Sequence, residues 1–196
     1  MIFHETKLPG ACLLEIEPHR DARGFFARSF CRDEFEARGL AADWVQSNIS
    51  FNAKQGTLRG MHWQVGPEAE TKLVRCTQGA IHDVIVDLRP DSETLGQWAG
   101  FELSAANRRA LYVPEGFAHG FLTLRDECEV FYEMGARHRP EAARGFRWDD
   151  PAVGIDWPHP PRILSERDAR FPDLPKDLRG VLASTACAAS QENRRE

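Results

Sequence analysis

The sequence lacks the features that mark membrane and secreted proteins. Its 196 residues contain no apolar run that approaches the roughly 20 residues needed to span a bilayer. The first five residues, MIFHE, do not show the charged and then apolar order of a signal peptide. The five cysteines are scattered and form no CxxC pair, which argues against a disulfide framework or a zinc knuckle. We therefore expect reduced thiols, a cytoplasmic location and no contact with a membrane.

An excess of positive charge is also missing. The chain has 25 Lys and Arg residues against 30 Asp and Glu residues, a formal net charge of -5 with both signs interspersed. This balance argues against a general nucleic-acid binder. The sequence has no GxGxxG motif that would hold a redox cofactor. We expect neither nucleic acid nor a cofactor among the ligands.

The chain is rich in short segments with the pattern of strands. Hydrophobic residues make up 42% of it, enough for the core of one domain. Alternating residues between Gly and Pro turns predict strands over residues 11–16, 73–76, 81–88, 98–103, 111–113, 117–122 and 129–133. Strands and helices do not alternate, and no internal repeat is present. The pattern predicts an all-β antiparallel sandwich or barrel.

Two short helices and a covering segment are expected beside the strands. Residues 31–40 are the better helix candidate, with Asp33 as the N-cap and Gly39 at the C-terminal end. Residues 140–175, rich in Pro and Trp, predict irregular chain over the barrel and a short helix that Ser165 caps, with Asp168 at its third position. We place the domain at residues 1–175 and expect residues 176–196 to form a flexible tail.

The segment from Gly56 to Gln64 concentrates polar chemistry. It carries a cation (Arg59), an imidazole (His62) and an amide (Gln64), and Lys72 follows shortly after it. Because side chains alternate along a strand, His62 and Gln64 share one face. A polar face with a histidine that looks into a barrel is typical of a site. An ordinary exposed strand face gives the same local pattern.

The ordered set of motifs along the chain resembles one known family. The motifs are DARGFF (21–26), QSN (46–48), GTLRGMHWQ (56–64), KLV (72–74), GAIHDV (79–84), PEGFAHGF (114–121), DDP (149–151) and IDWP (155–158). They match, in register, the dTDP-4-dehydrorhamnose 3,5-epimerase family. No single motif is decisive, but the ordered set is very specific.

The resemblance implies a fold, an assembly and a reaction. It implies a cupin-type jelly-roll barrel with short flanking helices, a homodimer, and no cofactor or metal. The substrate would be a nucleotide-linked 4-keto-6-deoxy sugar. Carried over by position, His62 is the general base and Asp168 its orienting carboxylate. Lys72 lies near the 4-keto oxygen, and Tyr132 is the proton donor on the opposite face.

Substrate binding is implied at further positions of the same motifs. These residues are Arg23, Arg28, Gln46, Ser47, Asn48, Arg59, Gln64, His119, His138 and Arg167. Arg23 and the run Gln46-Ser47-Asn48 would hold the nucleotide, and Arg59 and His119 would bind beside the catalytic residues.

Several positions depart from the family pattern. Arg28 stands where many relatives have glutamate, a reversal of charge that can remove a base contact or create a phosphate contact. His138 replaces a common tyrosine, Ala143 a common glutamate, and Arg167 a lysine. These departures leave open the nucleotide, the sugar, and whether C3 and C5 are both inverted.

The reaction needs the residue types that the motifs supply. A 4-keto group acidifies the protons on C3 and C5, and a histidine is the usual base for such a step near neutral pH. A carboxylate on the far ring nitrogen fixes the tautomer. A fixed ammonium stabilises the developing enolate oxygen. A tyrosine can return a proton to the other face, so the set predicts epimerisation at both carbons or at one.

Three other functions fit parts of the pattern. A metal-dependent cupin oxygenase would need two or three histidines and a carboxylate, often as His-x-His, whereas this strand reads His62-Trp63-Gln64 and Lys72 would repel a dication. A non-catalytic nucleotide-sugar binding module would not need the proton-transfer residues. A 3,4-ketoisomerase of the same class would move the carbonyl between C3 and C4, and product stereochemistry would distinguish it.

Overall fold

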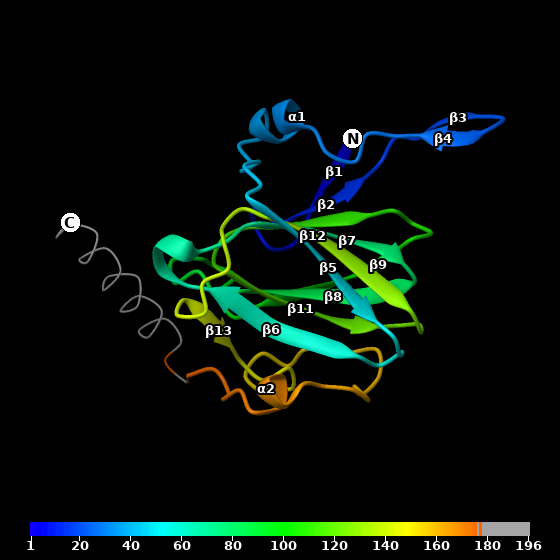
Figure 1. Ribbon diagram of the computed structural model, residues 1–196. Helices are drawn as coiled ribbons and strands as arrows, with labels where there is room; N and C mark the ends of the chain where they lie inside the picture. Colours follow the sequence, from blue (N-terminus) through cyan, green and yellow to red (C-terminus); the bar gives the residue numbers. More distant parts are fainter. Residues whose placement is uncertain (176, 178–196) are drawn as a thin grey trace.

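Two antiparallel sheets form the body of the protein in the computed structural model, which describes residues 1–175 and 177 (Figure 1). The six-stranded sheet has the order β1 (Ile2–Glu5), β2 (Cys12–Glu15), β10 (Ala110–Val113), β7 (Lys72–Gln78), β12 (Cys128–Met134), β5 (Gln46–Asn52). The five-stranded sheet has the order β13 (Ala143–Gly145), β6 (Leu58–Gln64), β11 (Phe117–Thr123), β8 (Ala80–Asp87), β9 (Trp98–Ser104). The predicted all-β antiparallel architecture is confirmed.

The main core lies between the two sheets. Val74 and Val130 of the six-stranded sheet pack with Ile81, Ile85 and Phe121 of the five-stranded sheet, and all of them are buried. Their alternation along each strand directs one face of every strand inward. Burial of this apolar surface holds the two sheets together around the cavity described below.

Both sheets are also covered on their outer faces. Val84 and Val86, on the outer side of β8, belong to a cluster with Phe146 and Trp157 from the segment predicted to wrap over the barrel. On the other sheet, Phe35 of α1 (Arg32–Glu36) fills a third cluster against β2, β7 and β10. Strand β8 is therefore buried on both faces, and even its aspartates, Asp83 and Asp87, are fully buried.

The first helix is shorter than predicted, Arg32–Glu36 instead of residues 31–40, and its N-cap is a different residue. Cys31 occupies the N-cap of α1 without a side-chain hydrogen bond, and Asp33 lies inside the first turn. The prediction of Asp33 as the cap was therefore wrong, because an acidic residue is also favoured inside the first turn, near the helix dipole. At the other end Gly39 has a φ of 69°, and the Leu40 N–H donates to the Phe35 carbonyl at 3.0 Å. Gly39 thus closes the turn that follows the helix, whose C-cap is Ala37 and not Gly39.

The second helix is positioned by its cap. α2 (Glu166–Ala169) begins after Ser165, whose Oγ accepts a hydrogen bond from the Asp168 N–H at 3.0 Å. The predicted cap is confirmed. The Asp168 carboxylate turns toward β6 instead of back to the Ser165 backbone.

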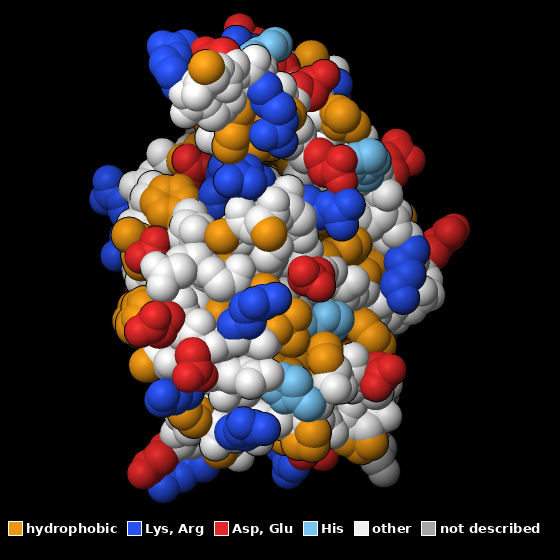
Figure 2. Space-filling view, turned by 90° about the vertical axis from the view of Figure 1, so that its right-hand side faces the viewer, with side chains coloured by type: hydrophobic (Ala, Val, Ile, Leu, Met, Phe, Trp, Pro, Cys, Tyr) orange, Lys and Arg blue, Asp and Glu red, His pale blue; other side chains and the backbone are white. Residues whose placement is uncertain are grey.

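A hairpin stands apart from the two large sheets. β3 (His19–Asp21) and β4 (Gly24–Phe26) pair with each other and project away from the barrel (Figure 1). Within residues 1–175 and 177, no helix has the length and apolar character needed to cross a membrane. On the face in Figure 2, acidic and basic side chains are interspersed. The expected tail, residues 176–196, lies outside the described residues except for Asp177.

We expect the folded protein to lose stability in mild acid because of His82. Its ring contacts Trp157, with centroids 6.0 Å apart, and its Nε2 is buried with no hydrogen-bond partner among the described residues. Burial lowers the pKa of His82 against the opposing pull of Asp83, Asp156 and Glu102. The unfolded chain, with an ordinary histidine pKa of about 6.5, then binds the proton more readily than the folded protein. Stability should therefore fall as pH drops from neutrality through that value.

Urea unfolding at pH 7.5 and at pH 5.5 measures this effect. His82→Gln should lose less unfolding free energy between the two pH values than the wild type does. The exposed His19 gives the matched control, and His19→Gln should keep the wild-type loss. An equal loss in wild type and His82→Gln would show that His82 does not set the acid side of the stability profile.

Candidate active site

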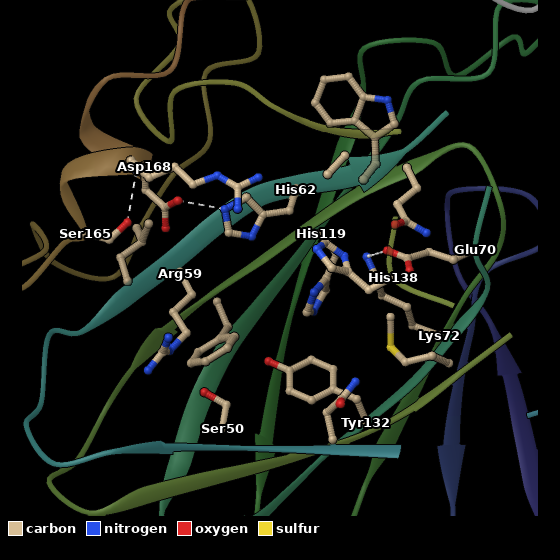
Figure 3. Close-up of a pocket in the computed structure, with 18 of the residues that line it drawn as sticks. Ser50, Arg59, His62, Glu70, Lys72, His119, Tyr132, His138, Ser165 and Asp168 are labelled. Atoms are coloured by element: carbon tan, nitrogen blue, oxygen red, sulfur yellow. Dashed lines mark hydrogen bonds and ion pairs between the residues drawn. The ribbon is translucent and has the colours of Figure 1, made fainter. Parts of the chain in front are cut away.

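A cavity of about 750 Å³ opens between the two sheets. Strands β5, β7 and β12 line it from one sheet and β6 and β11 from the other, together with segments around residues 138, 143–144 and 163–168. Figure 3 shows His62 and Tyr132 on opposite sides of this cavity, with His119 between them. The residues that the sequence singled out as proton-transfer groups therefore meet in one place.

Two glycines bring the central strands close together. Gly60 of β6 has a φ of 134°, and a Cβ added there would lie 2.6 Å from the Gly120 Cα of β11. Only glycine allows this approach at this backbone conformation. In the same pair of strands His62 is in register with His119, so both imidazoles face the cavity side by side.

His62 and Asp168 form a hydrogen-bonded pair. The Nε2 of His62 lies 2.7 Å from Oδ1 of Asp168, and the other carboxylate oxygen accepts the Gly60 N–H at 3.3 Å. Burial alone would raise the pKa of Asp168, but the hydrogen bond and charge of His62 and the Gly60 N–H hold it below its usual value. Asp168 therefore stays ionised near neutral pH. The Nδ1 of His62 has no partner among the described residues and is free to accept a proton.

An aromatic ring closes the other side of His62. Phe171 contacts the imidazole edge-on, with centroids 5.7 Å apart. A Cβ at Gly145 would lie 2.3 Å from this phenyl ring, so the glycine makes room for it. Phe171 was not among the predicted site residues, because no local sequence pattern ties it to β6.

Tyr132 is a protonated phenol on the far side of the cavity. Burial, and then the negative charge of Asp83, raise the pKa of Tyr132 well above its usual value, against the opposing effect of Arg59. The hydroxyl has no hydrogen bond within the part of the chain that the structure describes, and it points into the cavity (Figure 3). The Tyr132 phenol therefore keeps its proton near neutral pH and can donate it to a basic centre such as a carbanion.

His119 has a carboxylate of its own. Its Nε2 lies 2.8 Å from Oδ1 of Asp83, which is fully buried. The ring also meets Tyr132 edge-on, with centroids 6.1 Å apart. The second Asp83 oxygen is buried without a hydrogen-bond partner among the described residues. Asp83 was not among the predicted site residues, although it is one of the alternating residues of β8.

Lys72 is also paired with an acidic residue. Its Nζ lies 2.9 Å from Oε1 of Glu70, and both side chains are nearly buried. Arg59 stands nearer the mouth of the cavity, where its Nε donates to Asn52 at 2.8 Å and its guanidinium keeps exposed surface. The cavity thus combines a fixed ammonium inside with a guanidinium at its entrance.

Strand β5 contributes every second side chain to the cavity. Gln46, Asn48 and Ser50 line it, whereas Ser47 does not. The Gln46 amide donates to Asn48 at 3.0 Å, and its oxygen accepts from the His138 N–H at 3.4 Å. Strict alternation along the strand could have identified Ser50 in place of Ser47. Two further residues expected to bind substrate, His138 and Arg167, also line the cavity.

Gln64 lies at the cavity wall but is occupied by backbone. Its Nε2 donates to the carbonyls of Glu68 and Arg137 at 2.9 and 3.2 Å, and its oxygen accepts the Arg139 N–H at 2.6 Å. Both N–H groups are thus used within the protein. The side chain ties together the two loops that flank this end of the cavity.

Arg23 and Arg28 lie outside the cavity of their own chain. Arg23 sits in the β3–β4 hairpin and binds Asp21, with an ion-pair distance of 2.5 Å and 90% of its side chain exposed. Arg28 follows the hairpin and pairs with Glu34 at 2.8 Å. The geometry of one chain does not bring either residue to His62. Among the described residues there is also no group of three or more His, Cys, Asp or Glu that could hold a metal ion.

Comparison with known proteins identifies the family of the chain. The family model for dTDP-4-dehydrorhamnose 3,5-epimerase matches residues 5–176. The protein of that name from Methanothermobacter thermautotrophicus is 45% identical over 175 residues, 88% of this chain and 94% of the relative.

Comparison with solved structures points to the same family. The Bacillus anthracis dTDP-4-dehydrorhamnose 3,5-epimerase with TDP and pyrophosphate bound has a TM-score of 0.85 and 44% identity, covering 88% of this chain and 99% of that one. An epimerase from Legionella pneumophila, in complex with dTDP-4-keto-L-rhamnose, has a TM-score of 0.84 and 34% identity over 94% of this chain and 96% of that one. The chain belongs to the dTDP-4-dehydrorhamnose 3,5-epimerase family.

Proposed function

We propose that the protein is an isomerase that inverts C3 and C5 of dTDP-4-dehydro-6-deoxyglucose to give dTDP-4-dehydrorhamnose. One observation carries the proposal: the His62–Asp168 pair and the protonated Tyr132 face each other across a single cavity. Inversion at carbon needs a base on one face of the sugar and an acid on the other. Membership of the family supports the choice of substrate.

The proposed reaction passes through an enolate. The free Nδ1 of His62 removes the proton from C3 or C5, and the C–H electrons move into the carbonyl to leave negative charge on the 4-oxygen. Asp168 stabilises the imidazolium that forms. Lys72 donates to the 4-oxygen. Tyr132 then protonates the carbon from the opposite face. Its phenolate recovers a proton from solvent and the His62 imidazolium releases one to solvent, which restores both groups for the next carbon.

The polar residues at the mouth of the cavity suit the nucleotide. Arg59 and Arg167 are among the arginines that line the cavity, and a guanidinium binds two phosphate oxygens at once, so they would bind the diphosphate. Gln46, Asn48 and His138 supply amide and imidazole groups for the remaining contacts. His119, backed by Asp83, would bind the sugar beside His62.

We also propose a homodimer in which the hairpin of one protomer reaches the partner. Arg23 and Arg28 lie outside the cavity of their own chain, although the family resemblance assigns both to the substrate. Exposed apolar side chains support an interface: Phe26 is 78% exposed, Ile49 64% and Phe51 52%. Ile49 and Phe51 lie on the side of β5 that faces away from the cavity.

The dimer proposal predicts a monomer on substitution of Ile49. Ile49→Glu places a charge in the proposed interface without altering the cavity face of β5, and removing water from that charge is costly. Sedimentation velocity should show the mass of one chain for Ile49→Glu and of two chains for the wild type and the conservative Ile49→Val. A wild type that sediments as a monomer would contradict the proposal.

The cellular location is proposed to be the cytoplasm. Cys12, Cys31, Cys76 and Cys128 are all unpaired in the structure. Free thiols fit a reducing compartment.

Deuterium incorporation tests the reaction. The protein is incubated with dTDP-4-dehydro-6-deoxyglucose in D2O, and the product is analysed by mass spectrometry and NMR. Two deuterons with inverted C3 and C5 are expected. One deuteron would indicate epimerisation at a single carbon, and no deuteron would contradict the proposed substrate.

A further inference from the structure

The ion pair between Glu70 and Lys72 has no assigned role in the reaction above. The Nζ and Oε1 atoms are 2.9 Å apart, and the two side chains are only 7% and 9% exposed. Both line the cavity, where Glu70 lies beside Lys72 (Figure 3). Within residues 1–175 and 177 Lys72 has no second ion pair. Because a buried ammonium without a partner is unfavourable, Glu70 is the group that allows Lys72 to remain inside the cavity.

The backbone holds Glu70 in place from both sides. Before it, the Gln64 amide donates to the Glu68 carbonyl at 2.9 Å. After it, the Gly135 N–H donates to the Thr71 carbonyl at 2.9 Å. These contacts come from β6 and from the residue that follows β12, so the loop that carries Glu70 is fixed to both sheets. The backbone that carries the Glu70 carboxylate is therefore anchored on both sides.

We propose that Glu70 is a positioning residue that holds the Lys72 ammonium against the 4-oxygen of the substrate. This inference rests on the role proposed above for Lys72. An ammonium has three N–H donors, so one can bind Glu70 while the others remain for the enolate oxygen. A lysine side chain is long and flexible, and fixing its end in advance removes an entropic cost from the reaction.

The alternative is that Glu70 binds a sugar hydroxyl directly, independently of Lys72. A double-mutant cycle separates the two roles because it measures coupling between the side chains. The variants are Glu70→Ala, Lys72→Met and the two together, assayed by kcat and KM for deuterium uptake and product formation. Glu70→Gln keeps an oxygen acceptor of the same shape without the charge.

Glu70→Ala should lower kcat by about 10²-fold with KM little changed, the size of loss that misplacement of a reacting group by about 1 Å can cause. In the Lys72→Met background the same substitution should have no further effect. Glu70→Gln should recover most of the activity, because its oxygen can still accept from the ammonium. Glu68→Gln, on the same loop but outside the cavity, is the matched charge control and should behave as wild type.

The variants distinguish a failure of the Glu70 inference from a failure of the role proposed for Lys72. Losses that multiply in the double variant would show that Glu70 acts independently of Lys72 and would overturn the inference. A wild-type kcat for Glu70→Ala would do the same. A wild-type kcat for Lys72→Met would instead contradict the role of Lys72 itself, and the inference with it. If Glu70→Ala does not fold, Glu70→Asp, which moves the carboxylate away from Nζ, takes its place in the cycle with the same expected loss of coupling.

Discussion

Replacing His62 by alanine should abolish both deuterium uptake and epimerisation. Among the described residues, two cavity imidazoles are paired with a carboxylate at Nε2. His62 keeps a free Nδ1 and a partly exposed side chain, whereas His119 is nearly buried against Asp83. General-base catalysis contributes roughly 10²–10⁴-fold in rate. We therefore expect kcat to fall by about 10³-fold or more, measured by NMR of the product and by mass spectrometry of the substrate recovered from D2O.

Asp168→Asn provides the matched comparison. It keeps His62 and the size of the side chain but removes the negative charge that favours the imidazolium. This variant should lose activity, but less than His62→Ala. The fold of both variants is checked by circular dichroism, because Asp168 also accepts from the Gly60 N–H. Deuterium uptake at the wild-type rate in a folded His62→Ala protein would show that another group is the base.

Tyr132→Phe should separate proton removal from inversion. The phenyl ring preserves packing against His119 but cannot donate a proton. His62 can still form the enolate and return a deuteron to the same face, so recovered substrate should acquire deuterium. Inverted product should fall by about 10²-fold or more, the scale of a lost general acid.

The ratio of the two rates is the decisive measurement for Tyr132. In the wild type, deuterium uptake and product formation should be similar in rate, and in Tyr132→Phe uptake should exceed product formation. Equal loss of uptake and product would contradict the donor role. Because the pKa of Tyr132 is raised above its ordinary value, the wild type should not lose activity through ionisation of this phenol at pH 9.

Local sequence rules predicted the parts of the site that depend on one strand or one turn. The period of two in β6 placed His62 toward the cavity, and the Ser165 cap fixed the start of the helix that carries Asp168. The same period applied to β5 would have replaced Ser47 with Ser50. The error at Asp33 arose because an acidic residue near a helix start suits either the cap or the first turn.

Contacts between distant segments could not be derived in the same way. Asp168 and His62 are 106 positions apart, and Asp83 and His119 are 36 apart. Their pairing depends on how the covering segment and the strands pack. The family resemblance supplied the first pair, because it carries tertiary information that a single strand does not. The resemblance did not supply Asp83 or Glu70.

The sequence by itself determined the all-β class, the strand faces and the family to which the chain belongs, because strand periodicity, turn residues and motif order are all written along the chain. Only the tertiary structure decided the partners of the polar groups. In the folded chain, Lys72 forms an ion pair with Glu70, and the Gln64 amide binds the backbone of two loops. Arg23 lies outside the cavity of its own chain. The physical reason is that a buried polar group needs a hydrogen-bond or ion-pair partner that is close in space. That partner can lie on any segment, however distant along the chain.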